Sequence, residues 1–126
     1  MLNGMDENVR GQCASRGQYW LRKVQRELYK FRPAMYAGDE DNGEMASWYV
    51  LSTLGLFSLS PGSPEYIFGS PLFEEVHVTV NAVENTILTI RALDNKPDNY
   101  YIQSVTWNGI DMSMKNGIDF KLLMEG

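Results

Sequence analysis

The spacing of hydrophobic residues changes near residue 60 and predicts different secondary structure on the two sides. Before this point, apolar residues recur every three or four positions with arginine and lysine between them, which is typical of an α-helix. These apolar residues are Trp20, Val24, Leu28 and Phe31. We expect this helix to end near Phe31 or Arg32, because Pro33 follows and proline disfavours helical geometry in the residue before it.

A second helix is predicted over residues 43–54. Its apolar side chains point in nearly every direction around the axis, which is typical of a helix with neighbours on most sides. They are Met45, Trp48, Tyr49, Val50, Leu51 and Leu54. Gly55 follows, where a left-handed glycine commonly ends a helix. One helix and one sheet face would cover only part of this surface. We therefore expect a sheet that wraps the helix, or further partners in a larger protein or an oligomer.

After residue 60 the hydrophobic period becomes two, which predicts β-strands. The segments YYIQSVTWNG and IDFKLLM also alternate in this way. We predict an antiparallel sheet of about five strands within residues 65–124, with turns at Asn108-Gly109 and Asn116-Gly117 and a polar loop at DNKPDN. The clearest alternating apolar residues are Val76, Val78, Val80, Leu88 and Ile90.

These patterns predict an α+β protein. A helical segment over residues 1–60 precedes an antiparallel β segment over residues 61–126, and we expect the two to form one compact unit. The chain has 126 residues, enough for one domain. Its 44% hydrophobic and 12% aromatic residues are typical of a globular protein.

Charge and hydropathy narrow the possible partners. The net charge is −5 and no basic cluster is present, which argues against binding nucleic acid through its phosphates. No apolar run has the length of a membrane span, so no membrane partner is expected. The opening MLNGMDENVRGQ lacks the apolar core of a signal peptide, so none is expected on this chain. Cys13 is the single cysteine and is expected to have no special role.

Three consecutive acids, Asp39, Glu40 and Asp41, precede the second predicted helix. In an extended loop Asp39 and Asp41 point the same way and Glu40 points the other way. An ionised pair near the positive end of a helix dipole can deprotonate a water or bind a hard cation such as Ca²⁺. The alternative is a solvated loop in which Asp41 or Asn42 caps the helix. A loop starting at Asp39 does not fit the EF-hand pattern, because the required residues are missing at positions 5, 6 and 12.

The stretch YAGDEDNGEMASWYVLSTLGLFSLSPGSPEYIFGSPLF resembles the C-terminal signature of glycoside hydrolase family 92, the calcium-dependent exo-acting α-mannosidases. The matching features are an acidic loop followed by glycine, a Trp-Tyr helix, a Leu-Gly helix end, and the Pro-Gly-Ser-Pro and Gly-Ser-Pro-Leu-Phe segments. The segments GQYW and VQRELYKFRP upstream, and NYYIQSVTWNG downstream, resemble further parts of the family pattern. The resemblance runs from about Gly17 to the C-terminus.

The resemblance implies a role for the acidic loop. By position, Asp39 and Asp41 would orient and deprotonate the water that attacks the anomeric carbon of an α-mannoside, with inversion of configuration. The family's Ca²⁺ would bind hydroxyls of the mannose as a Lewis acid and template. The resemblance does not identify Ca²⁺ ligands in this chain. The implied partner is an α-linked mannoside or a mannose-containing glycan.

The family's general-acid glutamate and its Gly-Asn-Glu-Pro-Ser segment have no counterpart here. Family members are several times longer, with an N-terminal β-sandwich and a six-hairpin α/α barrel, and they are often secreted or periplasmic. We therefore expect a C-terminal part of such an enzyme, inactive alone, whose apolar helix is covered by the missing barrel or by self-association. The alternative is a non-catalytic β module that binds carbohydrate or protein.

Three further side chains are candidates on position alone. Trp48, one turn beyond the acidic loop, is a candidate wall of the sugar pocket, with a core position as the alternative. Trp107 lies beside a predicted turn and is expected to pack against the core or its rim. His77 lies on the polar face of a predicted strand, with no second histidine in the chain, and is expected to have no catalytic or metal-binding role.

Overall fold

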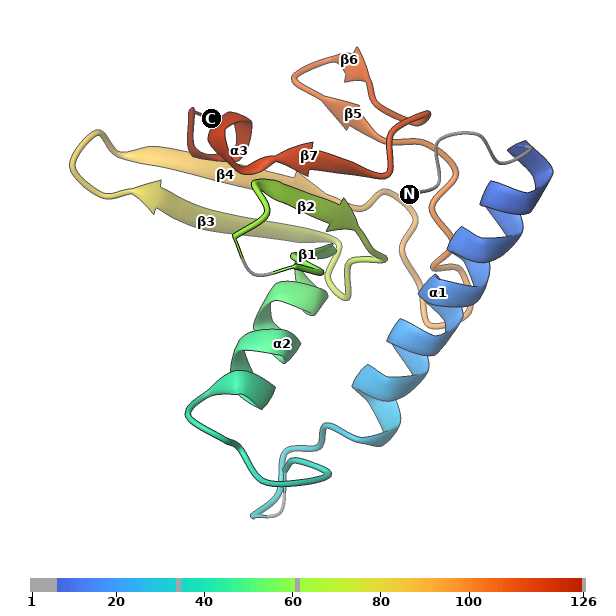
Figure 1. Ribbon diagram of the computed structural model, residues 1–126, viewed down its shortest axis with the longest axis vertical. Coiled ribbons are helices and arrows are strands. Elements are labelled where there is room, and N and C mark those ends of the chain that lie inside the picture. Colours follow the sequence, from blue (N-terminus) through green and yellow to red (C-terminus); the bar gives the residue numbers. More distant parts are fainter. Residues whose placement is uncertain (1–6, 34, 61, 126) are drawn as a thin grey trace.

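The computed structural model describes residues 7–33, 35–60 and 62–125, with side chains from Ala14 onward, so the side chain of Cys13 lies outside the described part. Helices and short antiparallel strands are combined (Figure 1), which confirms the predicted α+β class. The helices are α1 (Glu7–Glu27), α2 (Glu44–Thr53) and α3 (Phe120–Glu125). The strands are β1 (Leu56–Phe57), β2 (Glu65–Phe68), β3 (Glu75–Asn81), β4 (Thr86–Arg91), β5 (Thr106–Trp107), β6 (Ile110–Asp111) and β7 (Gly117–Asp119).

Helix α1 begins well before its apolar repeat and ends at Glu27, so the predicted end at residues 31–32 is wrong. The chain leaves the helical path at Tyr29. The ring of Tyr29 stacks on Trp48 and Tyr49 of α2, with centroid distances of 5.2 and 4.8 Å. Aromatic packing between distant residues therefore ends the helix one turn before proline would.

Helix α1 turns its polar side toward the rest of the protein. Arg22 and Gln25 are only 3% and 2% exposed, whereas Trp20 is 58% and Leu28 46% exposed. Phe31, just beyond the helix, is fully exposed. Three residues of the apolar repeat, Trp20, Leu28 and Phe31, are thus exposed, whereas Val24 is partly buried. In the described part of the chain, no helix combines the length and hydropathy needed to cross a membrane.

Polar contacts attach α1 to the loops beside the β-strands. Arg22 Nη2 donates hydrogen bonds to Ser70 Oγ (2.8 Å), the Pro71 carbonyl and Asn95 Oδ1 (3.1 Å). Its guanidinium lies over the Tyr100 ring, 5.2 Å from the centroid. Burial lowers the pKa of Arg22, and no carboxylate among the described residues pairs with it. This charge is therefore held by neutral acceptors and an aromatic face.

Two glutamines of α1 make similar contacts. Gln25 Nε2 donates to Ser52 Oγ of α2 (3.1 Å), and Gln18 Oε1 accepts from the Ile102 amide (2.9 Å). Gln18, Arg22 and Gln25 are three or four residues apart, so they lie on one face of the helix. This polar face makes the side-chain hydrogen bonds that hold α1 in place.

Helix α2 lies close to its predicted bounds, between the caps Gly43 and Leu54. Gly55 has φ +80°, which confirms the predicted left-handed glycine. The two side chains that α2 buries are polar, Ser52 and Thr53. Its apolar side chains remain partly exposed. The helix is therefore not enclosed by the described part of this chain.

The strands form three small antiparallel sheets rather than one sheet of about five strands. In these sheets β2 lies between β1 and β7, β3 pairs with β4, and β5 pairs with β6. In the β3–β4 hairpin, Val78 lies opposite Leu88 and Val76 opposite Ile90. These apolar residues are more buried than the polar residues that alternate with them, as the period of two predicted.

One of the two predicted Asn-Gly turns is confirmed. Asn108-Gly109 has φ values of +47° and +81° and joins β5 to β6. The predicted turn at Asn116-Gly117 is wrong, because Gly117 begins β7 and pairs with Ile67. A Cβ at Gly117 would overlap the carbonyl oxygen of Tyr66. Glycine is therefore needed here for the close approach of two strands.

The IDFKLLM segment, predicted as a strand, is a strand only as far as Asp119. Asp119 Oδ1 accepts a hydrogen bond from the Lys121 amide (2.8 Å), a typical N-terminal helix contact, and α3 follows. Leu123 of α3 joins the small buried core, which also contains Leu88, Met112 and Ile118. Trp107 packs against this core, as expected from its sequence position.

Candidate functional site

The acidic loop joins α1 to α2 at the end of the molecule remote from the β-strands (Figure 1). Asp41, Asn42 and Gly43 have φ values of +41°, +62° and +91°. Three successive left-handed residues turn the chain sharply into the helix. Gly43 is the N-cap and makes no side-chain cap, so the alternative in which Asp41 or Asn42 caps α2 is wrong.

The three acids of the loop differ in their surroundings. Asp39 and Asp41 are exposed, whereas Glu40 between them is partly buried. Glu40 Oε1 accepts a hydrogen bond from the Ala46 amide (3.1 Å). Neither aspartate carboxylate forms a hydrogen bond or ion pair with any described residue, and the Asp41 main-chain carbonyl accepts from the Glu44 amide at 3.4 Å. Both aspartate carboxylates are thus open to solvent, whereas the Glu40 carboxylate contacts α2.

An aromatic cluster packs between the segment that follows α1 and helix α2. Tyr29 stacks on Trp48 and Tyr49 and meets Tyr36 of the loop edge to face, at 5.8 Å between centroids. Burial, followed by the nearby Glu40 and Tyr36, raises the pKa of Tyr29, so its hydroxyl stays neutral. The cluster ties both ends of the loop to α2.

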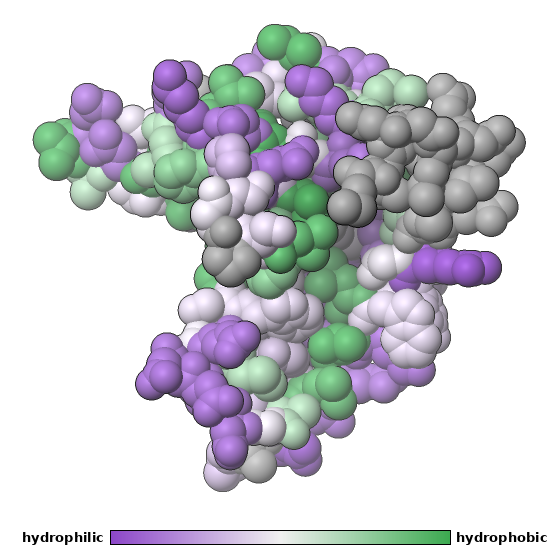
Figure 2. All heavy atoms as spheres, viewed as in Figure 1, coloured by the Kyte–Doolittle hydropathy of each residue, from purple (hydrophilic) through white to green (hydrophobic). Residues whose placement is uncertain are grey.

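Trp48 also lines a cleft of about 840 Å³ between α1, α2 and the β1–β2 pair. Hydrophobic atoms are visible in the hollow between the two helices (Figure 2). Leu21, Phe57 and Ile67 contribute to this lining, whereas no residue of the acidic loop does. Trp48 and the two exposed aspartates therefore do not share a pocket within the described part of the chain.

The acidic loop does not form a calcium site by itself. Ca²⁺ takes six to eight oxygen ligands. Among the described residues, no group of three or more His, Cys, Asp or Glu side chains is placed to hold a metal ion. Asp39 and Asp41 offer open carboxylates, but Glu40 is turned toward α2. The described side chains by themselves therefore do not provide a donor set that fits Ca²⁺.

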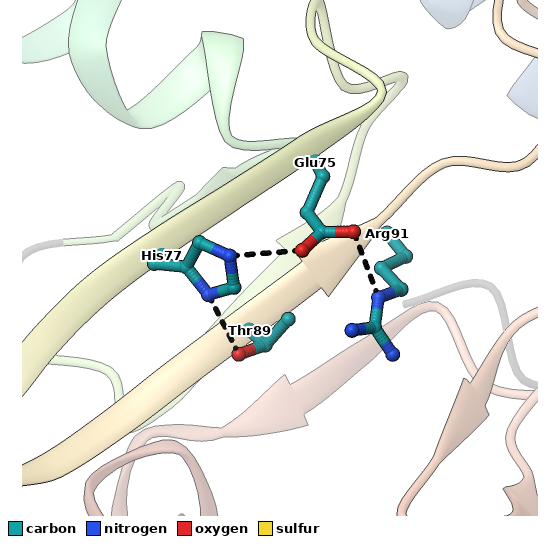
Figure 3. Close-up of polar contacts among 4 residues, drawn as sticks. All are labelled: Glu75, His77, Thr89 and Arg91. Atoms are coloured by element: carbon teal, nitrogen blue, oxygen red, sulfur yellow. Dashed lines mark hydrogen bonds and ion pairs between the residues drawn. The ribbon is translucent and has the colours of Figure 1, made fainter.

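A second polar cluster lies on the β3–β4 hairpin (Figure 3). Glu75 contacts His77 Nε2 through Oε1 (2.8 Å) and accepts from Arg91 Nε through Oε2 (2.9 Å). Thr89 Oγ1 lies 3.0 Å from His77 Nδ1. The hydrogen bond from Arg91 lowers the pKa of Glu75. These exposed side chains brace neighbouring positions of the two strands.

Known proteins that resemble this chain are glycoside hydrolases. Residues 10–126 match the sequence profile of the glycosyl hydrolase family 92 catalytic domain. The chain therefore belongs to glycosyl hydrolase family 92. It is also 34% identical over 91 residues to an uncharacterized secreted glycosidase of Arthroderma benhamiae. That match covers 71% of this chain and 11% of the fungal protein.

Solved structures of the same family superpose on this chain. A GH92 α-mannosidase of Bacteroides thetaiotaomicron gives a TM-score of 0.79 at 26% identity, over 86% of this chain and 14% of that chain. Its complex with mannoimidazole gives the same values. A GH92 inverting mannosidase of the same bacterium gives 0.78 at 34% identity, over 95% of this chain and 17% of that chain. This chain thus spans less than a fifth of the length of these relatives.

Sequence reasoning gave Glu40 no role beyond pointing away from its neighbours, and it did not identify Arg22. For Glu40 a signal was present. The dipeptide Asn42-Gly43 favours left-handed geometry, and a glycine at the helix start leaves the first amides without a side-chain cap. For Arg22 there was no local signal, because its partners are 48 to 73 residues away in sequence.

Proposed function

We propose that this chain supplies the general-base loop of an inverting, calcium-dependent α-mannosidase. The observation that carries the proposal is the pair of exposed, unpaired carboxylates of Asp39 and Asp41, in the loop that resembles the family signature. A general base needs an ionised carboxylate that can reach a water, and these two carboxylates are free to do so. The relatives that are α-mannosidases support an α-linked mannoside as the substrate.

The chemistry divides between this chain and residues outside it. Asp39 and Asp41 hold the attacking water and take its proton as the water attacks the anomeric carbon. In inverting glycosidases the acid and base carboxylates stand about 6.5–9.5 Å apart, on opposite faces of the sugar. Asp39 and Asp41 are two residues apart in one loop, so both act on the base side. The general acid, the Ca²⁺ ligands and most of the sugar pocket come from elsewhere in the enzyme.

The exposed apolar surface supports this division. Trp20 of α1, Leu28 just beyond it and Val50 of α2 are 46% to 58% exposed, although such side chains are usually buried. In the proposed assembly, the rest of the α/α barrel covers them. Segments 1–60 and 61–126 act as one unit within it. The contacts of Arg22 with Ser70 support that unit, because they join the two segments.

Complementation in trans tests the proposal. The GH92 inverting mannosidase of B. thetaiotaomicron is prepared without the segment that matches this chain, and the full 126-residue chain is added. We expect the complex to hydrolyse an aryl α-mannoside. Asp39→Asn and Asp41→Asn should each lower kcat by about 10²–10⁴-fold without weakening assembly. Glu84→Gln, on the distant β3–β4 turn, is the matched control and should have no effect. A complex that assembles but hydrolyses nothing contradicts the proposal.

The alternative function is a non-catalytic module that binds carbohydrate. The cleft beside Trp48 is the observation that favours it, since aromatic side chains often line sugar sites. Titration calorimetry of the isolated chain with mannose, with and without Ca²⁺, separates the two. Binding of mannose at millimolar affinity or tighter in the absence of Ca²⁺, lost in Trp48→Ala, supports the module. We expect no heat of binding.

A further inference from the structure

Glu40 provides the acceptors that the start of α2 lacks. The first amides of a helix have no partner within the helix and are usually capped by the N-cap side chain. The N-cap here is Gly43, which has no side chain. Instead, Glu40 Oε1 accepts from the Ala46 amide (3.1 Å), and the Glu40 carbonyl accepts from the Glu44 amide (3.1 Å). One residue thus caps α2 twice, through its side chain and its main chain.

This double contact holds the turn between Glu40 and the helix. Asp41 and Asn42 adopt positive φ values, which non-glycine residues rarely do. Such geometry persists only where surrounding contacts fix it. The Glu40 carboxylate also lies against the turn, with Oε1 3.9 Å from where a Cβ of Gly43 would stand. The anchored carboxylate therefore fixes the backbone of the residues that follow it.

Capping alone does not explain why a carboxylate stands at this position. Glu40 Oε2 is buried and accepts no hydrogen bond from the described residues, which is unfavourable for a charged group. Its two neighbours, Asp39 and Asp41, are exposed. The anchored Glu40 carboxylate thus stands between two exposed ones.

We propose that Glu40 is a positioning residue, which holds Asp39 and Asp41 in the orientation needed to bind and deprotonate the attacking water. This inference rests on the proposed general-base function of that pair. Glu40 does not touch the substrate. It acts through the Ala46 and Glu44 amides, and the left-handed turn transmits its position to the two aspartates.

Two variants at one position separate geometry from charge. Glu40→Gln keeps an oxygen acceptor for the Ala46 amide, and Glu40→Ala removes it. Glu44→Ala is the matched control, because it removes an exposed acid from the first turn of α2 without touching the turn. In the isolated full chain, backbone coupling constants by NMR should report positive φ at Asp41 and Asn42 in wild type, Glu40→Gln and Glu44→Ala. In Glu40→Ala the coupling constants of Asp41 and Asn42 should take averaged values, because both residues then exchange between positive and negative φ.

The complemented enzyme gives the functional readout. We expect Glu40→Ala to lower kcat by about 10²-fold, the loss typical of a misplaced catalytic group, with KM little changed. Glu40→Gln should restore most of kcat, and Glu44→Ala should match wild type. A cap of purely structural importance would lower thermal stability but leave kcat of the assembled complex intact, and that result overturns the inference. So does retention of the positive φ values in Glu40→Ala. Absence of hydrolysis with the wild-type chain overturns instead the proposed function.

Discussion

Arg22 of α1 donates a hydrogen bond of 2.8 Å to Ser70 Oγ, 48 residues further along the chain. Ser70 is 1% exposed, and its hydroxyl in turn donates a hydrogen bond to the Tyr100 carbonyl at 2.6 Å. Asn95 donates to the Pro71 carbonyl that Arg22 also uses. This network joins α1 to two segments that are remote from it in sequence, at Ser70-Pro71 and at residues 95–100. The attachment of α1 therefore depends on polar groups that are buried together.

Removing Arg22 should loosen α1 from the β-strands. We expect Arg22→Ala to lower the free energy of unfolding by about 2–4 kcal/mol, because it leaves buried acceptors unpaired and creates a cavity. Arg26→Ala, an exposed arginine one turn further on, should change it by less than about 0.5 kcal/mol. Urea denaturation followed by circular dichroism measures both. Equal stability of the two variants would show that the network contributes nothing.

The purified chain should not hydrolyse aryl α-mannosides on its own. It carries the proposed general base, but the described residues provide no opposing acid beside the acidic loop, and loss of acid catalysis alone costs about 10²–10⁴-fold in rate. In the proposed assembly most of the sugar pocket also comes from residues outside this chain, which lowers the rate further. The measurement is release of 4-nitrophenol at high protein concentration. Turnover at enzyme-like rates that disappears in Asp41→Asn would place the acid within this chain.

The isolated chain should bind Ca²⁺ no more tightly than about 10⁻³ M, the weak limit for protein calcium sites. The acidic loop supplies two open carboxylates, and the described residues contain no cluster of three or more candidate ligands. Calorimetric titration with CaCl₂ measures the affinity, with Asp39→Asn as the reference for non-specific binding. A micromolar site that is lost in Asp39→Asn contradicts this prediction.

The hairpin β3–β4 should lose stability in acid through Glu75. The hydrogen bond from Arg91 lowers the pKa of Glu75 in the folded state. The stabilisation is therefore complete above the ordinary glutamate pKa of about 4.3 and is lost as the pH falls through the lower, folded-state value. Thermal unfolding of wild type and Glu75→Gln should differ at pH 6 and converge in acid. Glu74→Gln, next to it in sequence, is the control and should follow wild type throughout.

The exposed apolar surface of α1 should cause the isolated chain to self-associate. Trp20 is 58% exposed, and its ring meets that of Tyr19, which is 40% exposed, edge to face at 5.4 Å between centroids. Size-exclusion chromatography with light scattering should show a dimer or larger species, and Trp20→Glu should shift it toward monomer. Val83→Glu is the control, because Val83 is also apolar and is 96% exposed on the β3–β4 hairpin. It should leave the mass of the associated species unchanged. A monomeric wild-type chain would contradict the prediction.

The features predicted correctly from sequence are those that local patterns determine. Helix α2 is bounded by Gly43 and Gly55, and the β3–β4 hairpin is recognised by its alternation of apolar and polar residues. In both cases residues close in sequence determine the structure. The pattern failed for α3, because FKLLM is too short to distinguish a strand from a helix. It also failed at Gly117, where glycine is required by the nearby Tyr66 carbonyl and not by a turn.

The candidate site was likewise predictable only where a local sequence pattern determines it. Asp39 and Asp41 are candidates from sequence because the acidic loop is a contiguous motif. The inward face of α1 was not predicted, because hydrophobic periodicity identifies a helix but not which face is buried. Here the buried face of α1 is determined by polar partners that are remote in sequence. The proposed role of Glu40 depends on three successive positive φ values, which no single residue type in the loop demands.

The outward apolar face formed by α1 and the residues just after it has a consequence for the lifetime of this chain in a cell. Chaperones and proteases recognise exposed apolar side chains as a sign of incomplete folding. A chain whose helices and strands are all in place would still carry that sign on Trp20, Leu28 and Phe31. Its lifetime would then be set by how quickly that face is covered, so its abundance should follow the supply of whatever covers it.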